Sequence, residues 1–223
     1  MNCPIRIWRA PRNIAFVDAR YVSIRNRKLR QSMAMEYHHF KREDFAYQSA
    51  YCEENIWHLC QQNNFQNSYV VFIFSKGEAF PMLNQRASEY TEFPIFWDYH
   101  VVLLVMNGNN QIFDFDTLLP FNTDMESYFS ESFVDERLLS HKETPLFRIV
   151  PSNEFVTLFS SDRSHMKTPS GWLSPPPSWP IIGVGTNLAG FIQAKANQFG
   201  KLLTYDAMLS RFNLSGEIGK RGK

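Results

Sequence analysis

Cysteine is scarce in this chain of 223 residues, and its three cysteines are an odd number. No CxxC pair and no His-rich spacing indicates a zinc site. The sequence therefore excludes a disulfide framework and favours a reducing compartment. We expect a functional site that needs neither a metal ion nor a cofactor.

Long apolar runs are also missing. No stretch approaches the roughly 20 apolar residues needed to cross a bilayer, and no apolar segment near the start resembles a secretory signal. At 44% hydrophobic and 15% aromatic residues, the chain still has ample material for one large core. We expect a soluble, intracellular, monomeric protein with no membrane partner. Its expected location is the cytoplasm, with the nucleus as a second location.

Charge is spread unevenly along the sequence. Residues 1–48 contain ten Lys or Arg and four acids, which leaves 13 basic and 18 acidic residues for the remainder. A basic leader is compatible with a nucleic-acid-binding arm or a mitochondrial transit peptide. A disordered extension, or a translation start at Met33 or Met35, is the simpler interpretation. We therefore assign residues 1–46 to a disordered basic extension, 47–215 to one folded domain and 216–223 to a tail, and expect no nucleic-acid partner.

Hydrophobic patterning predicts a single α+β domain. Apolar spacing indicates a helix over residues 51–62, and the β-branched and aromatic run over 69–74 indicates a buried strand. Strands over 97–106 and 111–115 flank an Asn-Gly-Asn-Asn tract, which is typical of a hairpin. The other expected elements are an amphipathic helix over 127–139, a strand over 146–150, a short element over 153–159, a proline-rich loop over 169–180 and a helix over 202–212.

Three residues have the chemistry of a thiol hydrolase, which needs a thiolate, an imidazole and a group that orients the imidazole. Cys52 begins the first helix, where the helix dipole stabilises a thiolate. His100 and Asp114 lie on the two strands of the hairpin. A simple register places Asp114 opposite about Leu103, so a register change or a bulge must bring it to His100, and Asp116 is the alternative orienting carboxylate. Each residue alone is more often structural; only their combination indicates a Cys-His-Asp site.

Several segments together resemble one family, the protein N-terminal glutamine amidohydrolases. The matching segments are YCEENIWHLC (51–60), VVFIF (70–74), FWDYHVVLL (96–104), FDFDTLLPF (113–121), SDRSHMK (161–167) and PSGWLSPPPSWP (169–180). Their order and spacing fit this eukaryotic family from about residue 47 to residue 212. Its members convert an N-terminal Gln of a polypeptide to Glu and release ammonia.

The resemblance implies roles for individual residues. It places the nucleophile on Cys52, the general base on His100 and the orienting aspartate on Asp114. It also implies a papain- or transglutaminase-like fold, in which helices flank a central antiparallel sheet. The implied partners are polypeptides with a free N-terminal Gln and later enzymes of a degradation pathway that reads N-terminal residues.

Selection of an N-terminal Gln requires an acceptor for the free α-ammonium, because the Gln side chain is an ordinary amide. The candidates are Asp98, Glu53 and Asp162. Asp98 is two residues from His100 and so shares its strand face. Glu53 follows the nucleophile, although its charge also suits a helix start. Asp162 has a structural alternative as the ion-pair partner of its neighbour Arg163.

Three more residues near these motifs receive weaker assignments. Trp97 and Tyr99 alternate with His100 along the strand, so we expect them in the core on the opposite face. His165 is a second imidazole in the matching segments, but its polar loop makes a catalytic role the less favoured interpretation.

Two alternatives to the amidohydrolase stay open. The same thiol chemistry serves a transglutaminase-like acyl transferase or a papain-like protease. An enclosed pocket at Cys52 would favour the amidohydrolase, whereas an open groove would favour the protease. The other alternative is a non-enzymatic binding module that uses the basic arm. The net negative charge of residues 49–223 argues against that module, because binding of phosphates depends on clustered Lys and Arg.

Overall fold

A computed structural model describes residues 40–65, 67–88, 90, 93–106 and 110–212. One six-stranded sheet forms its centre, in the order β10-β7-β1-β4-β5-β6. Every pair of neighbouring strands in it is antiparallel. Its strands are β1 (Ser68–Phe74), β4 (Tyr99–Met106), β5 (Asn110–Phe113), β6 (Asn122–Asp124), β7 (Leu146–Pro151) and β10 (Lys201–Thr204).

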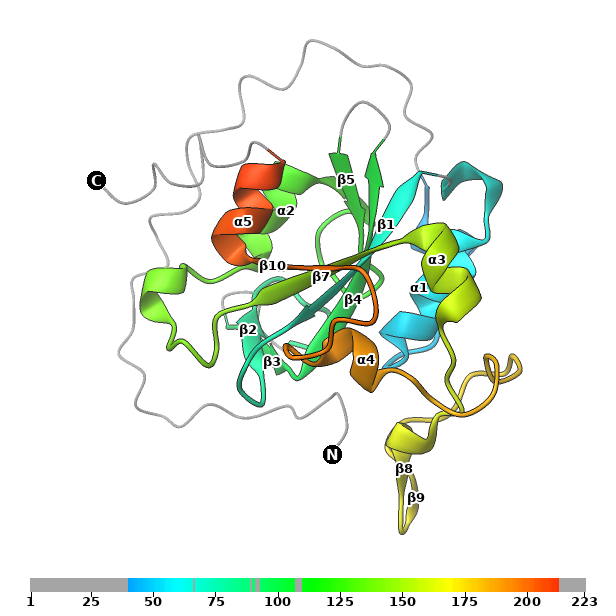
Figure 1. Cartoon of the computed structure of the whole chain (residues 1–223). Helices are drawn as coiled ribbons and strands as arrows, with labels where there is room; N and C mark the ends of the chain where they lie inside the picture. Colours follow the sequence, from blue (N-terminus) through cyan, green and yellow to red (C-terminus); the bar gives the residue numbers. More distant parts are fainter. Residues whose placement is uncertain (1–39, 66, 89, 91–92, 107–109, 213–223) are drawn as a thin grey trace.

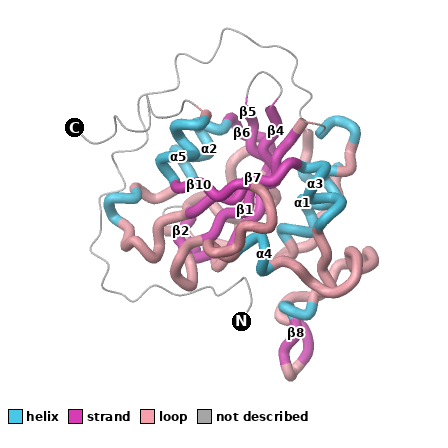
Figure 2. The backbone as a smooth tube through the Cα atoms, viewed as in Figure 1, coloured by secondary structure: helices cyan, strands magenta, loops and turns pink. Residues whose placement is uncertain are grey.

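Helices flank this sheet, and of two further short strand pairs one, β8 (Lys167–Thr168) with β9 (Gly171–Trp172), projects away from it (Figures 1 and 2). The helices are α1 (Cys52–Cys60), α2 (Met125–Ser132), α3 (Ser152–Leu158), α4 (Ala189–Ile192) and α5 (Tyr205–Arg211). The other strand pair joins β2 (Phe80–Met82) with β3 (Ile95–Trp97). Short 3-10 helices cover Arg42–Asp44, Asn63–Phe65, Glu136–Leu138 and Ser164–Met166. No helix in the described ranges has both the length and the apolar character of a membrane span.

Side chains alternate between the two faces of the sheet, and each face has its own core. Along β4, Tyr99, Val101 and Leu103 pack with residues of α1, α3 and α4. Val102 and Leu104 pack on the other face with residues of α2 and α5. Figure 1 shows these two groups of helices on opposite sides of the sheet. The strands are buried on both faces, which explains their continuous apolar sequences.

The structure confirms most of the predicted elements and the single α+β domain. The helix over 51–62 is α1, the strand over 69–74 is β1, the strand over 146–150 is β7, the element over 153–159 is α3, and β4 and β5 form the predicted hairpin. The turn tract at 107–109 lies outside the described residues.

Two predicted helices and one predicted strand need correction. The helix over 127–139 is the shorter α2, followed by an extended segment and a 3-10 turn. The helix over 202–212 is wrong in its first part, because β10 pairs with β7 there, with Leu203 opposite Phe147. Pairing with the sheet overrides the helical spacing. The strand over 97–106 is interrupted at Asp98, between β3 and β4.

The folded body starts before the predicted boundary at residue 47. Phe40 and Phe45 pack against the core, with their rings near that of Phe65. Arg42 donates a hydrogen bond to the carbonyl of Thr117. Part of the predicted extension is therefore bound to the domain, and its residues 1–39 lie outside the described residues, as do 213–223.

A buried guanidinium holds the segment between α4 and β10 against the sheet. The residue is Arg148 on β7, which is 1% exposed. It donates hydrogen bonds to the carbonyls of Phe191, Gln193, Ala196 and Phe199. A planar group with five donors suits four acceptors in this way, and a lysine ammonium does not.

We predict that Arg148→Met lowers the free energy of unfolding by roughly 3 kcal/mol, because it leaves the buried carbonyl of Phe191 and three part-buried carbonyls without their donor. Arg148→Lys should recover only part of this loss. The matched control is Arg137→Met, which removes an exposed ion pair with Asp135 and should cost less than about 1 kcal/mol. Urea denaturation of the three variants measures the differences. Equal stability of Arg148→Met and the wild type would contradict this role.

Candidate active site

Cys52 is the first residue of α1, and the helix is fixed in place by its neighbour Glu54. Both Glu53 and Glu54 lie in the first helical turn, where negative charge is favourable. The carboxylate of Glu54 accepts hydrogen bonds from the Arg163 guanidinium at 2.8 and 2.9 Å and from the Trp179 indole at 2.7 Å. Arg163 also donates to carbonyls at 177, 179 and 180. The proline-rich loop is thereby attached to the helix that begins with the thiol.

The aspartate of the site is positioned by the end of β5. The last residue pair between β4 and β5 is Leu103 with Phe113. Asp114 follows directly, and its backbone N–H donates to the carbonyl of Phe121, which continues the β5–β6 register beyond the last pair with β4. Its side chain is then free to turn back to His100. The hydrogen bond between His100 Nε2 and Asp114 Oδ1 is 2.9 Å long. The predicted pair therefore forms by departure from the strand, without a bulge.

Asp114 is fully buried and is held as a carboxylate. Oδ1 accepts hydrogen bonds from His100 and from the Asp116 backbone N–H, and Oδ2 accepts one from the Tyr128 hydroxyl at 2.8 Å. Burial by itself would raise the pKa of Asp114, but His100 and these hydrogen bonds lower it below its ordinary value. An ionised carboxylate can only accept, so Nε2 of His100 carries the proton in this bond.

That assignment leaves Nδ1 of His100 as the nitrogen available for proton transfer. Nδ1 is buried and has no hydrogen-bond partner. The ring stacks on the Trp97 indole, with centroids 4.8 Å apart. Burial would lower the pKa of His100, but the charge and hydrogen bond of Asp114 raise it overall. His100 is therefore a strengthened base with a fixed orientation.

Trp97 does not occupy the position expected for it. Because the strand breaks at Asp98, simple alternation does not extend from β4 back to Trp97, and its ring covers His100. It is nevertheless a core residue, as predicted, since it is 3% exposed. Tyr99 does point to the face opposite His100, where its hydroxyl donates to Glu53 at 3.0 Å.

Cys52 is 5% exposed, and its sulfur lies beside the backbone of Val101 on β4. A hydrogen bond from the backbone of Val101, the residue after His100, lowers the pKa of the thiol. Burial, followed by the charges of Glu53, Asp116 and Asp98, outweighs this and raises the pKa well above its ordinary value. The stabilising effect of a helix start, on which the sequence argument relied, is therefore not dominant in the free protein.

Glu53 is the acid nearest to the nucleophile. Its Oε2 lies 3.6 Å from the Cys52 sulfur. Its Oε1 lies 3.5 Å from Nε2 of His165, but it is buried and has no hydrogen-bond partner. His165 therefore belongs to the surroundings of the thiol, which its position in a polar loop did not indicate. Its place beside Glu53 depends on long-range packing, because the two residues are far apart in the sequence.

The other two predicted substrate-binding acids differ in their settings. Asp98 lies between β3 and β4 and accepts a hydrogen bond from the Tyr99 backbone N–H. Burial, with a smaller contribution from Glu53, raises the pKa of Asp98 from 3.8 to about 7. Asp162 instead accepts a hydrogen bond from the Ser164 backbone N–H. The suggested Asp162–Arg163 pair is wrong, because Arg163 pairs with Glu54.

Asp116 is the second carboxylate beside the imidazole. His100, Asp114 and Asp116 bring potential metal-ligand atoms within 4.8 Å of one another. Several of these atoms are already engaged, since Asp116 accepts the Tyr47 hydroxyl at 2.6 Å and Asp114 accepts three hydrogen bonds. The side chains of His100, Asp114 and Asp116 therefore belong to a hydrogen-bond network. The expected absence of a metal ion and a cofactor stays a prediction.

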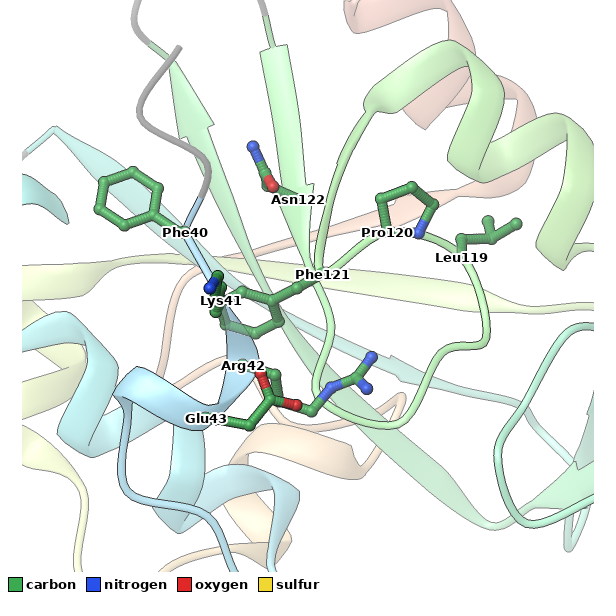
Figure 3. Close-up of a pocket in the computed structure, with 8 residues that line it drawn as sticks. All are labelled: Phe40, Lys41, Arg42, Glu43, Leu119, Pro120, Phe121 and Asn122. Atoms are coloured by element: carbon green, nitrogen blue, oxygen red, sulfur yellow. The ribbon is translucent and has the colours of Figure 1, made fainter.

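A surface hollow of about 260 Å³ lies elsewhere on the molecule. Figure 3 shows that residues 40–43 and 119–122 line it. Neither Cys52 nor His100 is among these residues. The hollow marks where the start of the described chain crosses the segment that leads into β6.

The fold and the site define an α+β protein with a candidate Cys-His-Asp centre at the edge of its sheet. The chain belongs to the N-terminal glutamine amidase family, whose model matches residues 47–212.

Similar proteins from several fruit flies are named protein N-terminal glutamine amidohydrolase. The one from Drosophila ananassae is 38% identical over 154 residues, covering 65% of this chain and 75% of the relative. That from Drosophila grimshawi is 37% identical over 188 residues, covering 78% of this chain and 92% of the relative. That from Drosophila melanogaster is 37% identical over 157 residues, covering 66% of this chain and 77% of the relative.

We predict that Asp98→Asn changes how stability depends on pH. Because the pKa of Asp98 is raised, the folded state keeps this proton between about pH 4 and pH 7, where the unfolded chain loses it. Stability therefore falls as pH rises through this window. The difference between 3.8 and about 7 limits the effect to about 4 kcal/mol, and partial exposure reduces it.

Urea denaturation at several values between pH 4 and pH 7.5 measures this effect. Asp98→Asn should remove that part of the decline. Asp162→Asn is the control: the pKa of Asp162 is lowered, chiefly by its hydrogen bond with Ser164, so it should not reduce the decline. Parallel curves for Asp98→Asn and the wild type would show that Asp98 does not titrate in this window.

Proposed function

We propose that this protein hydrolyses the side-chain amide of an N-terminal glutamine, so that the polypeptide then begins with glutamate and ammonia is released. The observation that carries the proposal is the 2.9 Å bond from His100 Nε2 to Asp114, which leaves the buried Nδ1 without a hydrogen-bond partner. Family membership and the names of the relatives agree with it. The same arrangement supports a papain- or transglutaminase-like fold.

The proposed reaction starts with attack of the Cys52 sulfur on the substrate's carboxamide carbon. Nδ1 of His100 takes the thiol proton, and the backbone N–H of Cys52, with one further donor, holds the oxyanion. His100 then returns the proton to the leaving nitrogen as the C–N bond breaks and ammonia departs. A γ-glutamyl thioester remains on Cys52. Water then gives one proton to His100, its oxygen attacks the thioester, and the C–S bond breaks to regenerate the thiol.

Glu53 is the best candidate acceptor for the substrate's α-ammonium. It combines a position next to the nucleophile with a buried carboxylate oxygen that lacks a donor. Asp98 ranks second, because Tyr99 engages one of its oxygens and because its raised pKa keeps it partly protonated near neutral pH. Asp162 ranks third, since it caps the turn that begins the 3-10 helix of residues 164–166.

The expected biological setting extends this proposal. Its partners are polypeptides with a free N-terminal Gln and later enzymes that read the new N-terminal Glu. We further propose that the protein acts as a monomer in the cytoplasm, with the nucleus as a second location. An acyl transferase or protease that uses the same thiol is the alternative, and a non-enzymatic module is the alternative of another class.

We predict ammonia release from a peptide that begins with a free Gln, and none from the matching Asn or acetyl-Gln peptides. Cys52→Ala should abolish the release, whereas Cys60→Ala, which removes the other described free thiol, should retain it. A coupled ammonia assay measures each case. Activity in Cys52→Ala would refute the mechanism, and equal release from acetyl-Gln would refute the requirement for an ammonium. Incorporation of an added amine at the γ-carbonyl would favour the acyl transferase.

We further predict that Tyr128 positions the orienting aspartate. Tyr128→Phe removes one hydrogen bond from buried Asp114, so the pKa of that carboxyl rises and its protonation begins at a higher pH. The acidic limb of the plot of kcat against pH should move to higher pH, with kcat reduced about tenfold at neutral pH. Tyr205→Phe, another buried tyrosine, controls for packing. A uniform loss without movement of the acidic limb would indicate a purely structural role.

A further inference from the structure

The surroundings of the Cys52 thiol oppose its ionisation in the free protein. The sulfur lies 3.6 Å from Glu53 Oε2, and Glu53 is fully buried. At this distance and away from water, a thiolate and a carboxylate repel each other strongly. In the free protein these surroundings therefore favour the neutral, less reactive form of the thiol.

Groups on every neighbouring element contribute to this state. The acidic ones are Glu53 on α1, Asp98 between β3 and β4, and Asp116 after β5, and each raises the pKa of Cys52. The groups able to carry positive charge are His100, which is bonded to Asp114, His165, which faces Glu53, and Arg86, whose charge lowers the pKa of Asp116. In the described part of the chain, no Lys or Arg forms an ion pair with Glu53, Asp98 or Asp116. The charges that act on the thiol itself are the acidic ones, and all of them oppose its ionisation.

The same cluster also has unused hydrogen-bonding capacity. Glu53 Oε1 is buried without a donor, and both ring nitrogens of His165 are buried without hydrogen-bond partners. Leaving buried polar atoms unpaired is costly, so such atoms point to a missing ligand. A ligand that suits this place has several N–H donors and a positive charge. A primary ammonium has both.

We propose that the α-ammonium of the substrate activates Cys52 by binding to Glu53. This inference rests on the proposed function and concerns how that function is switched on. The ammonium donates to Oε1 and offsets the carboxylate charge, so that the thiol proton can pass from the sulfur to Nδ1 of His100. The thiolate then attacks the carboxamide of the same substrate molecule. Selection for a free N-terminus is therefore a selection in rate, because a blocked terminus leaves the nucleophile protonated.

Alkylation by iodoacetamide tests this proposal, because it measures the thiolate without requiring turnover. The sulfur forms a C–S bond as the C–I bond breaks, iodide leaves, and the thiol proton passes to solvent. The probes are a tripeptide amide that begins with alanine and its N-acetylated form, neither of which has a carboxamide side chain to hydrolyse. Mass spectrometry of the Cys52 peptide follows the rate separately from that of Cys60.

At constant pH, the free alanine peptide should accelerate alkylation of Cys52 by about tenfold or more, equivalent to a pKa lowered by at least one unit. The acetylated peptide should have no effect. Glu53→Gln should raise the basal rate by a similar factor and abolish the response to the free peptide. The control is Glu126→Gln, which alters an exposed glutamate in the first turn of α2 and should behave as the wild type.

Ammonia release from a Gln peptide is measured in the same preparations. If the wild type releases ammonia but its alkylation rate is the same with and without the free alanine peptide, this inference is overturned and the proposed function stands. If the wild type releases no ammonia, the proposed function itself fails. Should Glu53→Gln not fold, as judged by circular dichroism, the comparison of the two peptides on the wild type decides the question.

Discussion

The candidate site depends on one constraint in the sheet, the end of β5 at Phe113. Because β5 stops opposite Leu103, the first half of β4 has no strand partner on that side within the described residues. An edge of this kind exposes backbone groups that must find other partners. Here the backbone of Val101 contacts the Cys52 sulfur, and Asp114 leaves the ladder to reach His100.

The surroundings of the site favour ionisation of Asp114 and oppose ionisation of the Cys52 thiol. On one side of His100, Asp114 is stabilised as a carboxylate by three hydrogen bonds and strengthens the imidazole as a base. Next to the nucleophile candidate, burial and the charge of Glu53 raise the pKa of the thiol, whose proton His100 takes in the reaction that we propose. His100 is thus a strengthened base, whereas the Cys52 thiol is favoured in its neutral form. A positive charge near Glu53 would favour the thiolate. In the activation that we propose, binding of the substrate's ammonium to Glu53 both selects a free N-terminus and activates the thiol.

The sequence predicted the elements better than the contacts. A run such as that of β1 is apolar because both faces are buried, and this information is local. The break at Asp98 and the strand character of β10 were missed, because pairing with distant strands decides them. The three residues proposed for catalysis could be named from helix start, hairpin and resemblance. The rotation of Trp97 onto His100 and the approach of His165 to Glu53 had no local signal.

A comparison of Glu53 with Glu54 shows that the unpaired Oε1 of Glu53 is not a general consequence of burial at the start of α1. They are adjacent in one helical turn, and both are fully buried. Arg163 and Trp179 satisfy Glu54 completely, so this fold can supply donors to a buried glutamate at the start of α1. Glu53 receives the Tyr99 hydroxyl and the Cys52 thiol on Oε2 and no donor on Oε1. Burial alone therefore does not explain its state, whereas the ammonium that we propose the substrate supplies would give Oε1 a donor.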